Sequence, residues 1–272
     1  MSVIIPNFNK EKYLEECLDS VLNQTLLPTE VIVVDDVSSD GSRDIIRKYS
    51  ENNPIIKPLF LKENGGVSKA RNAGIEAATS EYVTFLDSDD FYYSTKKLEN
   101  EMSLIKKYRE KGKDILAYSA TVLVEDDGSM KYLPVRHKAW YLQGNIYRHI
   151  VAQAKKETNP RDFIVKKSIV EEVGAYCYPK DFYEDLDFAI RLARRVPYYC
   201  TCDYGSAYRY VPVGLSNKDI PLSVHLEAID SITQVYKNDM NAWDLFLLKV
   251  FYRWWRIERY PLRLIRKIVT GI

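Results

Sequence analysis

The sequence is poor in cysteine and histidine, with four cysteines and three histidines among 272 residues. Four scattered cysteines are too few for the disulfide framework of a small secreted protein. The C-x-C pair of Cys200 and Cys202 lacks the second pair that a structural zinc site needs. The first apolar run begins at Ser2 without a preceding basic segment, which predicts that there is no secretory signal. These features favour a cytoplasmic protein with reduced thiols.

Two common nucleotide-binding motifs are also missing. No G-x-G-x-x-G follows a predicted strand, and no G-x-x-x-x-G-K-[ST] occurs. The first absence argues against a dinucleotide site, and the second excludes a P-loop. A net charge of +1 argues against a general role in binding nucleic acid. A phosphate-containing ligand would therefore have to be held in another way.

The first hundred residues alternate between apolar runs and amphipathic segments. The runs predict strands at 2–6, 30–36 and 82–90. Helical spacing of apolar residues predicts helices over 13–22, 43–49 and 68–78. Asn9 is a candidate N-cap of the first helix. Continuous apolar strands joined by helices are typical of a doubly wound parallel sheet, so the predicted fold class is α/β.

The pattern changes after residue 97. Apolar spacing predicts a helix around Leu98 to Ile105, and residues 114–133 read as a strand, an Asp-Gly turn and a returning strand. Further helices are expected at 166–173 and 183–195. We expect a catalytic domain over 1–215, with a ligand-binding lobe (1–105) and a second lobe (106–215), and a helical, basic and aromatic extension over 216–272.

Polar residues follow each predicted strand where it ends. They are "PNFN" (Pro6 to Asn9), "DDVSSDGS" (Asp35 to Ser42) and "DSDD" (Asp87 to Asp90). In open parallel sheets, ligands bind outside the carboxyl ends of the strands. Helix capping alone explains Asp40 or Asp44, but it is insufficient for two successive strands that both end in paired acids.

The crowded acids of "DSDD" predict a cationic partner. Neighbouring carboxylates raise one another's pKa unless a cation or a basic side chain neutralises them. A divalent cation that also holds a diphosphate meets this demand. Lys69 and Arg71 follow Gly65 and Gly66 and either add positive charge at the same edge or are solvated helix charges.

Four segments in this order resemble the inverting glycosyltransferases of family 2, which have the GT-A fold. They are "SVIIPNFNKEKYLEECLDSVLNQT", "EVIVVDDVSSDGS", "NGGVSKARNAGIEAATSEYVTFLDSDD" and "VGAYCYPKDFYEDLDFAIRLARR". The resemblance implies a Rossmann-like, mainly parallel sheet with flanking helices. It also implies a nucleotide-diphosphate sugar as donor, usually a UDP-sugar, and Mn²⁺ or Mg²⁺ as cofactor.

The resemblance also assigns residues to the donor site. Pro6, Asn7 and Phe8 would line the base pocket, and Asp36 would hydrogen-bond the uracil. Asp87, Ser88 and Asp89 match the D-x-D element, in which Asp87 contacts ribose and Asp89 binds the metal. Asp90 either supports the metal site or approaches the donor sugar.

Glu184 and Asp185 lie where the family keeps its general base, and we assign that role to Asp185. The alternative is that both acids complement the dipole of the helix that they begin. A base is needed because the acceptor hydroxyl must lose its proton as it attacks the anomeric carbon. One departure concerns the metal: many relatives carry a histidine after a "YR" pair, where this chain has Val211 and Pro212.

Residues 243–272 combine aromatic residues with regularly spaced arginines. The segment is too basic for a spanning helix, and it suits either an interfacial helix on anionic lipid or packing on the body or a second subunit. Membrane contact would fit a lipid-linked saccharide acceptor in surface polysaccharide synthesis, with the protein peripheral on the inner face. A sugar-nucleotide-binding scaffold without turnover is the alternative function. A receiver-like protein is disfavoured, because it needs an acid pair after the first strand.

Overall fold

The computed structural model describes residues 1–132, 143–151, 160, 162–177, 184–211, 242–243 and 246. The chain divides into two compact units, which comprise residues 1–146 with 159–219 and residues 147–158 with 220–272. The first unit contains both sheets. The domain boundaries expected at 105 and 215 stay predictions.

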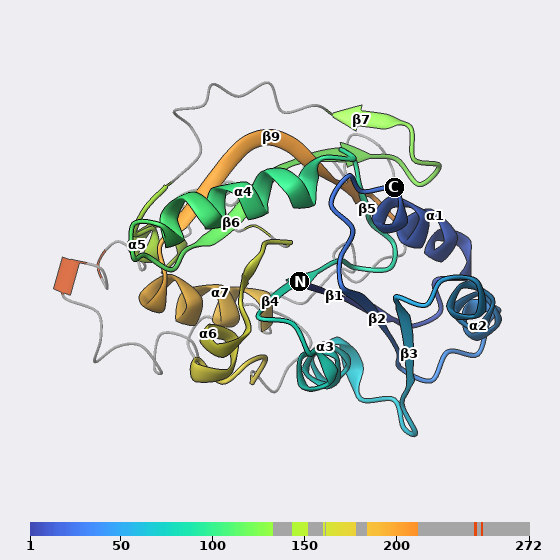
Figure 1. The fold of residues 1–272 in the computed structure, drawn as a ribbon. Helices are drawn as coiled ribbons and strands as arrows, with labels where there is room; N and C mark the ends of the chain where they lie inside the picture. Colours follow the sequence, from blue (N-terminus) through green and yellow to red (C-terminus); the bar gives the residue numbers. More distant parts are fainter. Residues whose placement is uncertain are drawn as a thin grey trace, which may run out of the picture. The chain divides into compact units, whose positions relative to one another are not determined.

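The first sheet has the strand order β3-β2-β1-β4-β8 (Figure 1). Its strands are β1 (Ser2–Asn7), β2 (Glu30–Asp35), β3 (Ile56–Phe60), β4 (Tyr82–Phe85) and β8 (Val165–Lys166). All neighbouring strands are parallel except β4 and β8. Every residue of β1, β2 and β4 is buried, as expected for strands that are covered on both faces. The predicted α/β class with a mainly parallel sheet is confirmed.

Three helices cover the two faces of this sheet, namely α1 (Glu11–Leu22), α2 (Ser42–Asn52) and α3 (Gly66–Ala77). Alternate strand residues point to opposite faces. Ile5 of β1 belongs to one core cluster with Leu14 of α1 and Ile46 of α2. Ile4 points to α3, where a Cβ added to Gly74 would lie 2.4 Å from Cγ2 of Ile4. The sheet is therefore doubly wound, and the close approach of α3 requires glycine at position 74.

The predicted elements miss β3 at the sheet edge. Pro58 interrupts its sequence, and Ile56 is its one buried residue, so the strand lacks a continuous apolar run. Proline is tolerated in an edge strand because one side of the strand makes no ladder hydrogen bonds. The pattern that identifies central strands therefore fails at this edge.

The start of α1 also differs from the expectation. Lys10, not Asn9, is its N-cap, and no side-chain hydrogen bond caps the helix from that position. Asn9 has a left-handed backbone (φ 53°), and its Oδ1 accepts a hydrogen bond from the backbone N–H of Ser39 (2.8 Å). Asp40 supplies the cap, because its carboxylate accepts hydrogen bonds from the N–H groups of Glu11 (2.9 Å) and Ser42 (3.0 Å). The capping role suggested for Asp40 is confirmed.

The second sheet has the order β5-β9-β6-β7. It contains β5 (Phe91–Tyr92), β6 (Leu116–Val124), β7 (Met130–Tyr132) and β9 (Tyr198–Arg209). The predicted hairpin of β6 and β7 is confirmed, with Gly128 at φ +83° in its turn. β9 is absent from the predicted elements. Cys202 (φ 64°) interrupts its extended backbone, and its register with β6 shifts, so no simple alternation marks it.

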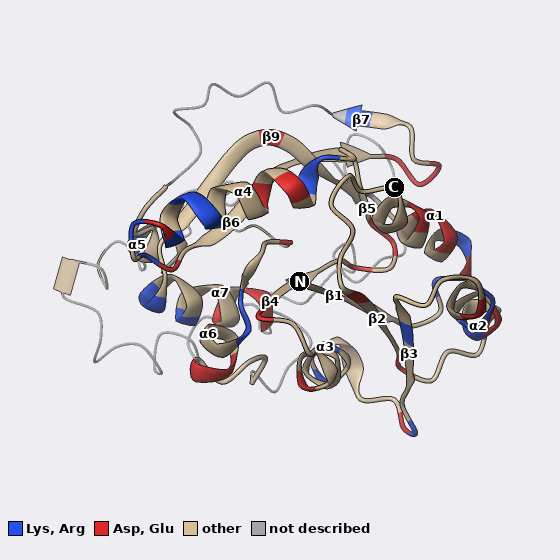
Figure 2. Ribbon diagram, viewed as in Figure 1, with Lys and Arg blue, Asp and Glu red and all other residues tan. Residues whose placement is uncertain are grey.

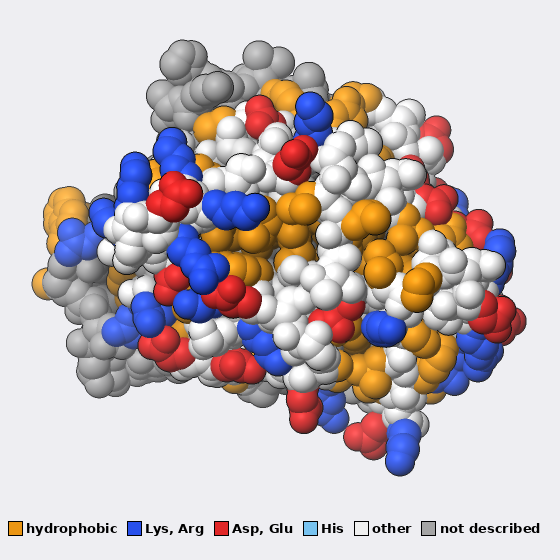
Figure 3. Space-filling view, in the orientation of Figure 1, with side chains coloured by type: hydrophobic (Ala, Val, Ile, Leu, Met, Phe, Trp, Pro, Cys, Tyr) orange, Lys and Arg blue, Asp and Glu red, His pale blue; other side chains and the backbone are white. Residues whose placement is uncertain are grey.

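The remaining helices of the first unit are α4 (Lys97–Arg109), α6 (Lys167–Glu172) and α7 (Glu184–Arg195), all close to their predicted positions. Basic residues occupy the last turns of α4 and α7. Figure 2 shows them as blue segments of both ribbons, and Figure 3 shows Lys and Arg gathered on the same side of this face. Cations at helix C-termini are stabilised by the helix dipole, so helix geometry accounts for these charges.

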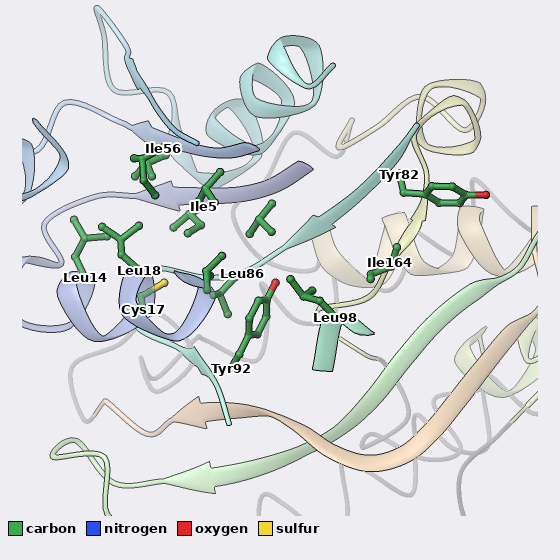
Figure 4. Close-up of a cluster of buried hydrophobic side chains, with 14 of the residues drawn as sticks. Ile5, Leu14, Cys17, Leu18, Ile56, Tyr82, Leu86, Tyr92, Leu98 and Ile164 are labelled. Atoms are coloured by element: carbon green, nitrogen blue, oxygen red, sulfur yellow. The ribbon is translucent and has the colours of Figure 1, made fainter. Parts of the chain in front are cut away.

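The main core holds the loop that contains "DSDD" from both ends. Leu86 precedes Asp87 and is 1% exposed, and Tyr92 follows Asp90 and is 4% exposed. Both belong to the cluster that includes Cys17 of α1 and Leu98 of α4, as Figure 4 shows. The acids are thus carried on a short loop between two buried anchors.

None of the four cysteines forms a disulfide. Among the helices that the structure describes, none is long and apolar enough to cross a membrane. The second unit contains α5 (Tyr147–Val151). The segment 243–272 lies outside the described residues except for Trp243 and Phe246, whose exposed rings stack with centroids 5.3 Å apart. Its predicted membrane or subunit contact stays a prediction.

Candidate functional site

The polar ends of β1, β2 and β4 lie side by side, because these strands are parallel neighbours. Asn7 is in register with Asp35, and its carbonyl accepts a hydrogen bond from the N–H of Asp36 (2.8 Å). Leu86, immediately after β4, donates its N–H to the carbonyl of Ile4 (3.0 Å). The three polar segments found in the sequence therefore share one edge of the sheet.

Asp35 is a buried carboxylate that organises the loop after β2. Its oxygens accept hydrogen bonds from Asn7 Nδ2 (3.2 Å), the N–H of Ser38 (3.1 Å) and Arg43 Nε (2.6 Å). Burial alone would raise its pKa, but the hydrogen bonds from Ser38, Arg43 and Asn7 hold the pKa below its ordinary value. Asp35 is fully buried and is accounted for by these contacts.

Asp36 fixes the start of α3. Its two carboxylate oxygens accept hydrogen bonds from the N–H groups of Gly65 and Gly66, at 2.8 Å each. Gly66 has φ +81°, a conformation that favours glycine. A carboxylate at a helix N-terminus is also stabilised by the helix dipole. Each oxygen keeps a second lone pair for another donor, so the predicted contact with uracil stays a prediction.

Two basic residues partner the second half of "DSDD". Nζ of Lys10 lies 2.5 Å from Oδ2 of Asp89. Arg209 donates its backbone N–H to Oδ1 of Asp90 (2.8 Å) and its Nε–H to the carbonyl of Asp89 (2.9 Å). Its guanidinium also contacts the carbonyl of Asp126 and the carboxylate of Glu16. Arg209 thereby ties the acidic loop to β9 and the β6–β7 turn.

Arg71 joins the first acid of "DSDD" to the acids that begin α7. Its Nη2 lies 2.7 Å from Oδ1 of Asp87, and its Nη1 lies 2.9 Å from Oδ1 of Asp185 and 3.6 Å from Oε1 of Glu184. The guanidinium carbon lies 5.0 Å from the ring centroid of Tyr176. Burial alone would lower the pKa of Arg71, but the charges of Asp87 and Asp185 raise it well above its ordinary value.

Aromatic packing places α7 beside β4. The ring of Phe85 meets those of Tyr176 and Phe188 edge-on, with centroids 5.6 and 6.2 Å away. Asn72 of α3 exchanges two hydrogen bonds with the backbone of Tyr176, at 2.8 and 3.0 Å. The edge-on ring contacts are a favourable aromatic geometry. Together with the two hydrogen bonds, they fix the spacing between α3, β4 and α7. They bring Asp185 to the end of β4.

Glu184 and Asp185 differ in accessibility and protonation. The side chain of Glu184 is 10% exposed, whereas that of Asp185 is 39% exposed. Burial, aided by the charge of Asp185, raises the pKa of Glu184 to about 8. This raised pKa favours the protonated form of Glu184 at neutral pH, and its catalytic role stays a prediction. Asp185 is the acid of the pair that solvent, and hence an acceptor hydroxyl, can reach.

The other predicted site residues differ in how far they are buried. Pro6 and Ser88 are buried, while Phe8 is 47% exposed at the end of β1. Lys69 does not join the acids: it is exposed and pairs with Glu63 at 3.6 Å. The assignment of these residues to substrate binding stays a prediction.

Lys10 and Arg209 are site residues that the sequence reasoning missed. Lys10 directly follows "PNFN", so the adjacency of strand ends would have placed it near "DSDD". Arg209 is the arginine of the "YR" pair, Tyr208 and Arg209, which no histidine closely follows here. Its contact with Asp90 depends on β9, an element without a clear sequence pattern. No pattern over so long a sequence separation could have revealed it.

Two buried polar atoms at this edge lack hydrogen-bond partners among the described residues. They are Nε of Arg71 and Oδ1 of Asn7. Buried polar groups in native proteins are nearly always paired, with protein, water or ligand.

The acids fit a divalent cation that a ligand helps to hold. In the part of the chain that the structure describes, no three His, Cys, Asp or Glu side chains form a metal-binding group. Mg²⁺ is commonly bound by one or two carboxylates together with substrate phosphates. Asp89, with its side chain 23% exposed, provides such a carboxylate. The donor set therefore suits a site completed by a diphosphate.

A family model described as "Glycosyl transferase family 2" matches residues 2–159. Glycosyltransferase TuaG of Bacillus subtilis (strain 168), which is named for teichuronic acid biosynthesis, is 42% identical over 105 residues; these are 39% of this chain and 41% of TuaG. Glycosyltransferase GlyG of Streptococcus pneumoniae serotype 4 is 34% identical over 133 residues, 48% of this chain and 42% of GlyG. The chain therefore spans less than half the length of these relatives.

Among solved structures, residues 1–349 of S. aureus TarS in complex with UDP-GlcNAc match with a TM-score of 0.71 and 22% identity. The match covers 92% of this chain and 71% of that chain. At this identity the likeness establishes the fold alone. It agrees with the parallel sheet and flanking helices described above.

Proposed function

The chain belongs to glycosyl transferase family 2, and from this membership we propose that it transfers a sugar from a UDP-sugar to a hydroxyl group. The acceptor is a saccharide or a lipid-linked saccharide, and a single displacement inverts the anomeric centre. The sugar transferred is a hexose or a hexose derivative. The reaction contributes to the synthesis of a surface polysaccharide or glycoconjugate.

The bridge formed by Arg71 carries this proposal. One guanidinium contacts Asp87 at 2.7 Å and Asp185 at 2.9 Å, although these acids are distant in sequence. A donor held by the acids after β4 would therefore have its reacting carbon near Asp185. This adjacency is what a single displacement requires, because the base acts on a hydroxyl that attacks the anomeric carbon.

The remaining roles divide along the sheet edge. The base of the donor would lie against Pro6, Asn7 and Phe8, with Asp36 hydrogen-bonded to uracil. Uridine is supported by the TarS complexes with UDP-GlcNAc and UDP, whose fold is similar.

The diphosphate end of the donor would lie toward "DSDD". Asp87 would contact ribose, and Asp89 would hold Mn²⁺ or Mg²⁺. When bound, the cation supplies stabilisation of the negative charge that develops on the leaving diphosphate. Asp90 would support the metal site or approach the donor sugar, and its Oδ1 also accepts the backbone N–H of Arg209 (2.8 Å).

The proposals for the acceptor and for the cellular location rest on segment 243–272, most of which lies outside the described residues. Segment 243–272 would lie on anionic lipid with its arginines and tryptophans, which places a cytoplasmic enzyme on the inner face of the membrane. A lipid-linked acceptor is then within reach. Dimerisation through the same segment is the competing role for it.

Ligand-dependent thermal stability tests the donor site. UDP and UDP-sugars with Mn²⁺ should raise the melting temperature, whereas GDP- and CDP-sugars should raise it less. A ligand that binds only the folded state at a concentration of 100 times its Kd stabilises by roughly 2.7 kcal/mol. Omission of Mn²⁺ should reduce the effect. If none of these nucleotides stabilises the protein with metal present, the donor-site assignment is wrong.

A further inference from the structure

Lys10 pairs with the acid that is proposed to bind the metal. Its Nζ lies 2.5 Å from Oδ2 of Asp89, with 26% and 23% of the two side chains exposed. We propose that Lys10 is the resident counter-cation of Asp89 and that a divalent cation binds by displacing its ammonium group. This inference rests on the proposed function, because it concerns the same donor site.

The backbones on both sides of this ion pair are fixed. Lys10 donates its N–H to Oγ of Ser42 (3.2 Å), and its carbonyl accepts hydrogen bonds from the N–H groups of Tyr13 (2.9 Å) and Leu14 (3.0 Å). On the other side, the carbonyl of Asp89 is held by Arg209 (2.9 Å). The two α-carbons are therefore anchored, and the exchange needs only side-chain rotation.

The contacts of the neighbouring acids are built differently. Asp87 is held by Arg71, whose side chain is 6% exposed and also bonded to Asp185. Asp90 is held by a backbone N–H group of β9, which cannot leave without unpairing the strand. Lys10 instead has a flexible stem and a compact ammonium that water readily solvates. Of these three contacts, the Lys10 contact is therefore the one that a divalent cation can replace by rotation of a single side chain.

The displaced ammonium has an obvious destination. A diphosphate held together with a cation at Asp89 would bring phosphate oxygens close to Lys10, because Nζ already contacts this carboxylate. Phosphate oxygens accept charge-assisted hydrogen bonds from lysine as carboxylates do. Lys10 would therefore move from Asp89 to the phosphate when donor and cation arrive together, which keeps the local charge balanced in both states. Mn²⁺ alone, without a diphosphate, has to displace Lys10 without this compensation.

The test is the affinity of the protein for Mn²⁺ in the absence of nucleotide, measured by the electron paramagnetic resonance of free Mn²⁺. Lys10→Gln should bind Mn²⁺ about tenfold more tightly than the wild type, because one positive charge no longer competes for Asp89. Lys12→Gln is the matched control: it removes a charge two residues away that pairs with Asp126. The control should bind Mn²⁺ like the wild type.

A second titration follows UDP at saturating Mn²⁺. Lys10→Gln should bind UDP several-fold more weakly than the wild type, because the phosphate loses a charge-assisted contact. Unchanged or weaker binding of Mn²⁺ alone by Lys10→Gln, or equal effects of Lys10→Gln and Lys12→Gln, overturns the role of Lys10. If the wild type binds no UDP, the proposed function fails, while the Mn²⁺ titration still decides whether Lys10 competes for Asp89.

Discussion

Replacement of Asp185 by asparagine should lower the rate of sugar transfer by about 10²–10⁴-fold, the usual contribution of a general base, while UDP binding stays nearly unchanged. Asparagine has the shape of aspartate but cannot accept the proton of an acceptor hydroxyl. The amide can still lie beside Arg71, so the loop and the start of α7 should keep their positions. The measurement is UDP release from a UDP-sugar with acceptor, together with calorimetric titration of UDP.

The structure gives reasons to expect this effect at Asp185 and not at the neighbouring acid. Arg71 contacts Oδ1 of Asp185, and 39% of the Asp185 side chain is exposed. Glu184 is mostly buried, and its pKa of about 8 keeps it largely protonated at neutral pH. Asp185 is therefore the acid of the pair that combines accessibility with a direct contact to arginine, and the proposal assigns the role of base to it.

A matched control is Glu171→Gln on α6. Its carboxylate is 56% exposed and pairs with Lys167 at 3.5 Å, so its removal changes the charge without touching the site. Transfer by this variant should equal that of the wild type. Wild-type transfer by Asp185→Asn would show that another group takes the proton.

Replacement of Arg71 by methionine should destabilise the protein by roughly 3 kcal/mol, because it leaves carboxylates partly buried without their cation. The side chain of Arg71 is 6% exposed, and it contacts Asp87, Asp185 and Glu184. Methionine fills much of the volume, so the loss would come from charge and not from a cavity. This value lies at the low end for a broken buried pair, since Asp87 and Asp185 are partly exposed.

The melting temperature measures this effect, and a fall of roughly 5–10 °C is expected for a domain of this size. Arg47→Met is the control, because Arg47 pairs with Asp44 on the surface of α2, with both side chains more than half exposed. Its loss should change stability by less than about 0.5 kcal/mol. Equal melting temperatures for the two variants would mean that the charge of Arg71 does not stabilise the buried acids around it.

The central sheet could be predicted from the sequence because its strands are buried on both faces. Such strands need continuous apolar runs, and those of β1, β2 and β4 stand out. β3 and β9 lack such continuous apolar runs, and the reasons are physical. β3 is an edge strand with a proline, and β9 bends at Cys202 and is only partly covered. Edge position and curvature are tertiary properties that local patterns do not encode.

The part of the site that strand order determines could be predicted from the sequence. Parallel strands bring their carboxyl ends together, so Asn7, Asp36 and the acids of "DSDD" had to share one edge. The expectation that these acids need a positively charged partner is met in part by basic side chains, and the divalent cation stays a prediction. The structure adds that Lys10, Arg71 and Arg209 already meet part of this need. Those contacts join residues far apart in sequence and depend on packing between α1, α3 and β9.

The most direct measurement of the central claim is release of UDP from UDP-sugars by the wild-type protein, with Mn²⁺ and with EDTA. The account predicts time-dependent release that requires the metal and increases when a suitable saccharide acceptor is present. A protein that binds UDP-sugars but releases no UDP under any of these conditions would be a binding scaffold. That result would contradict the assignment of Asp185 and Asp89 to a working transferase site.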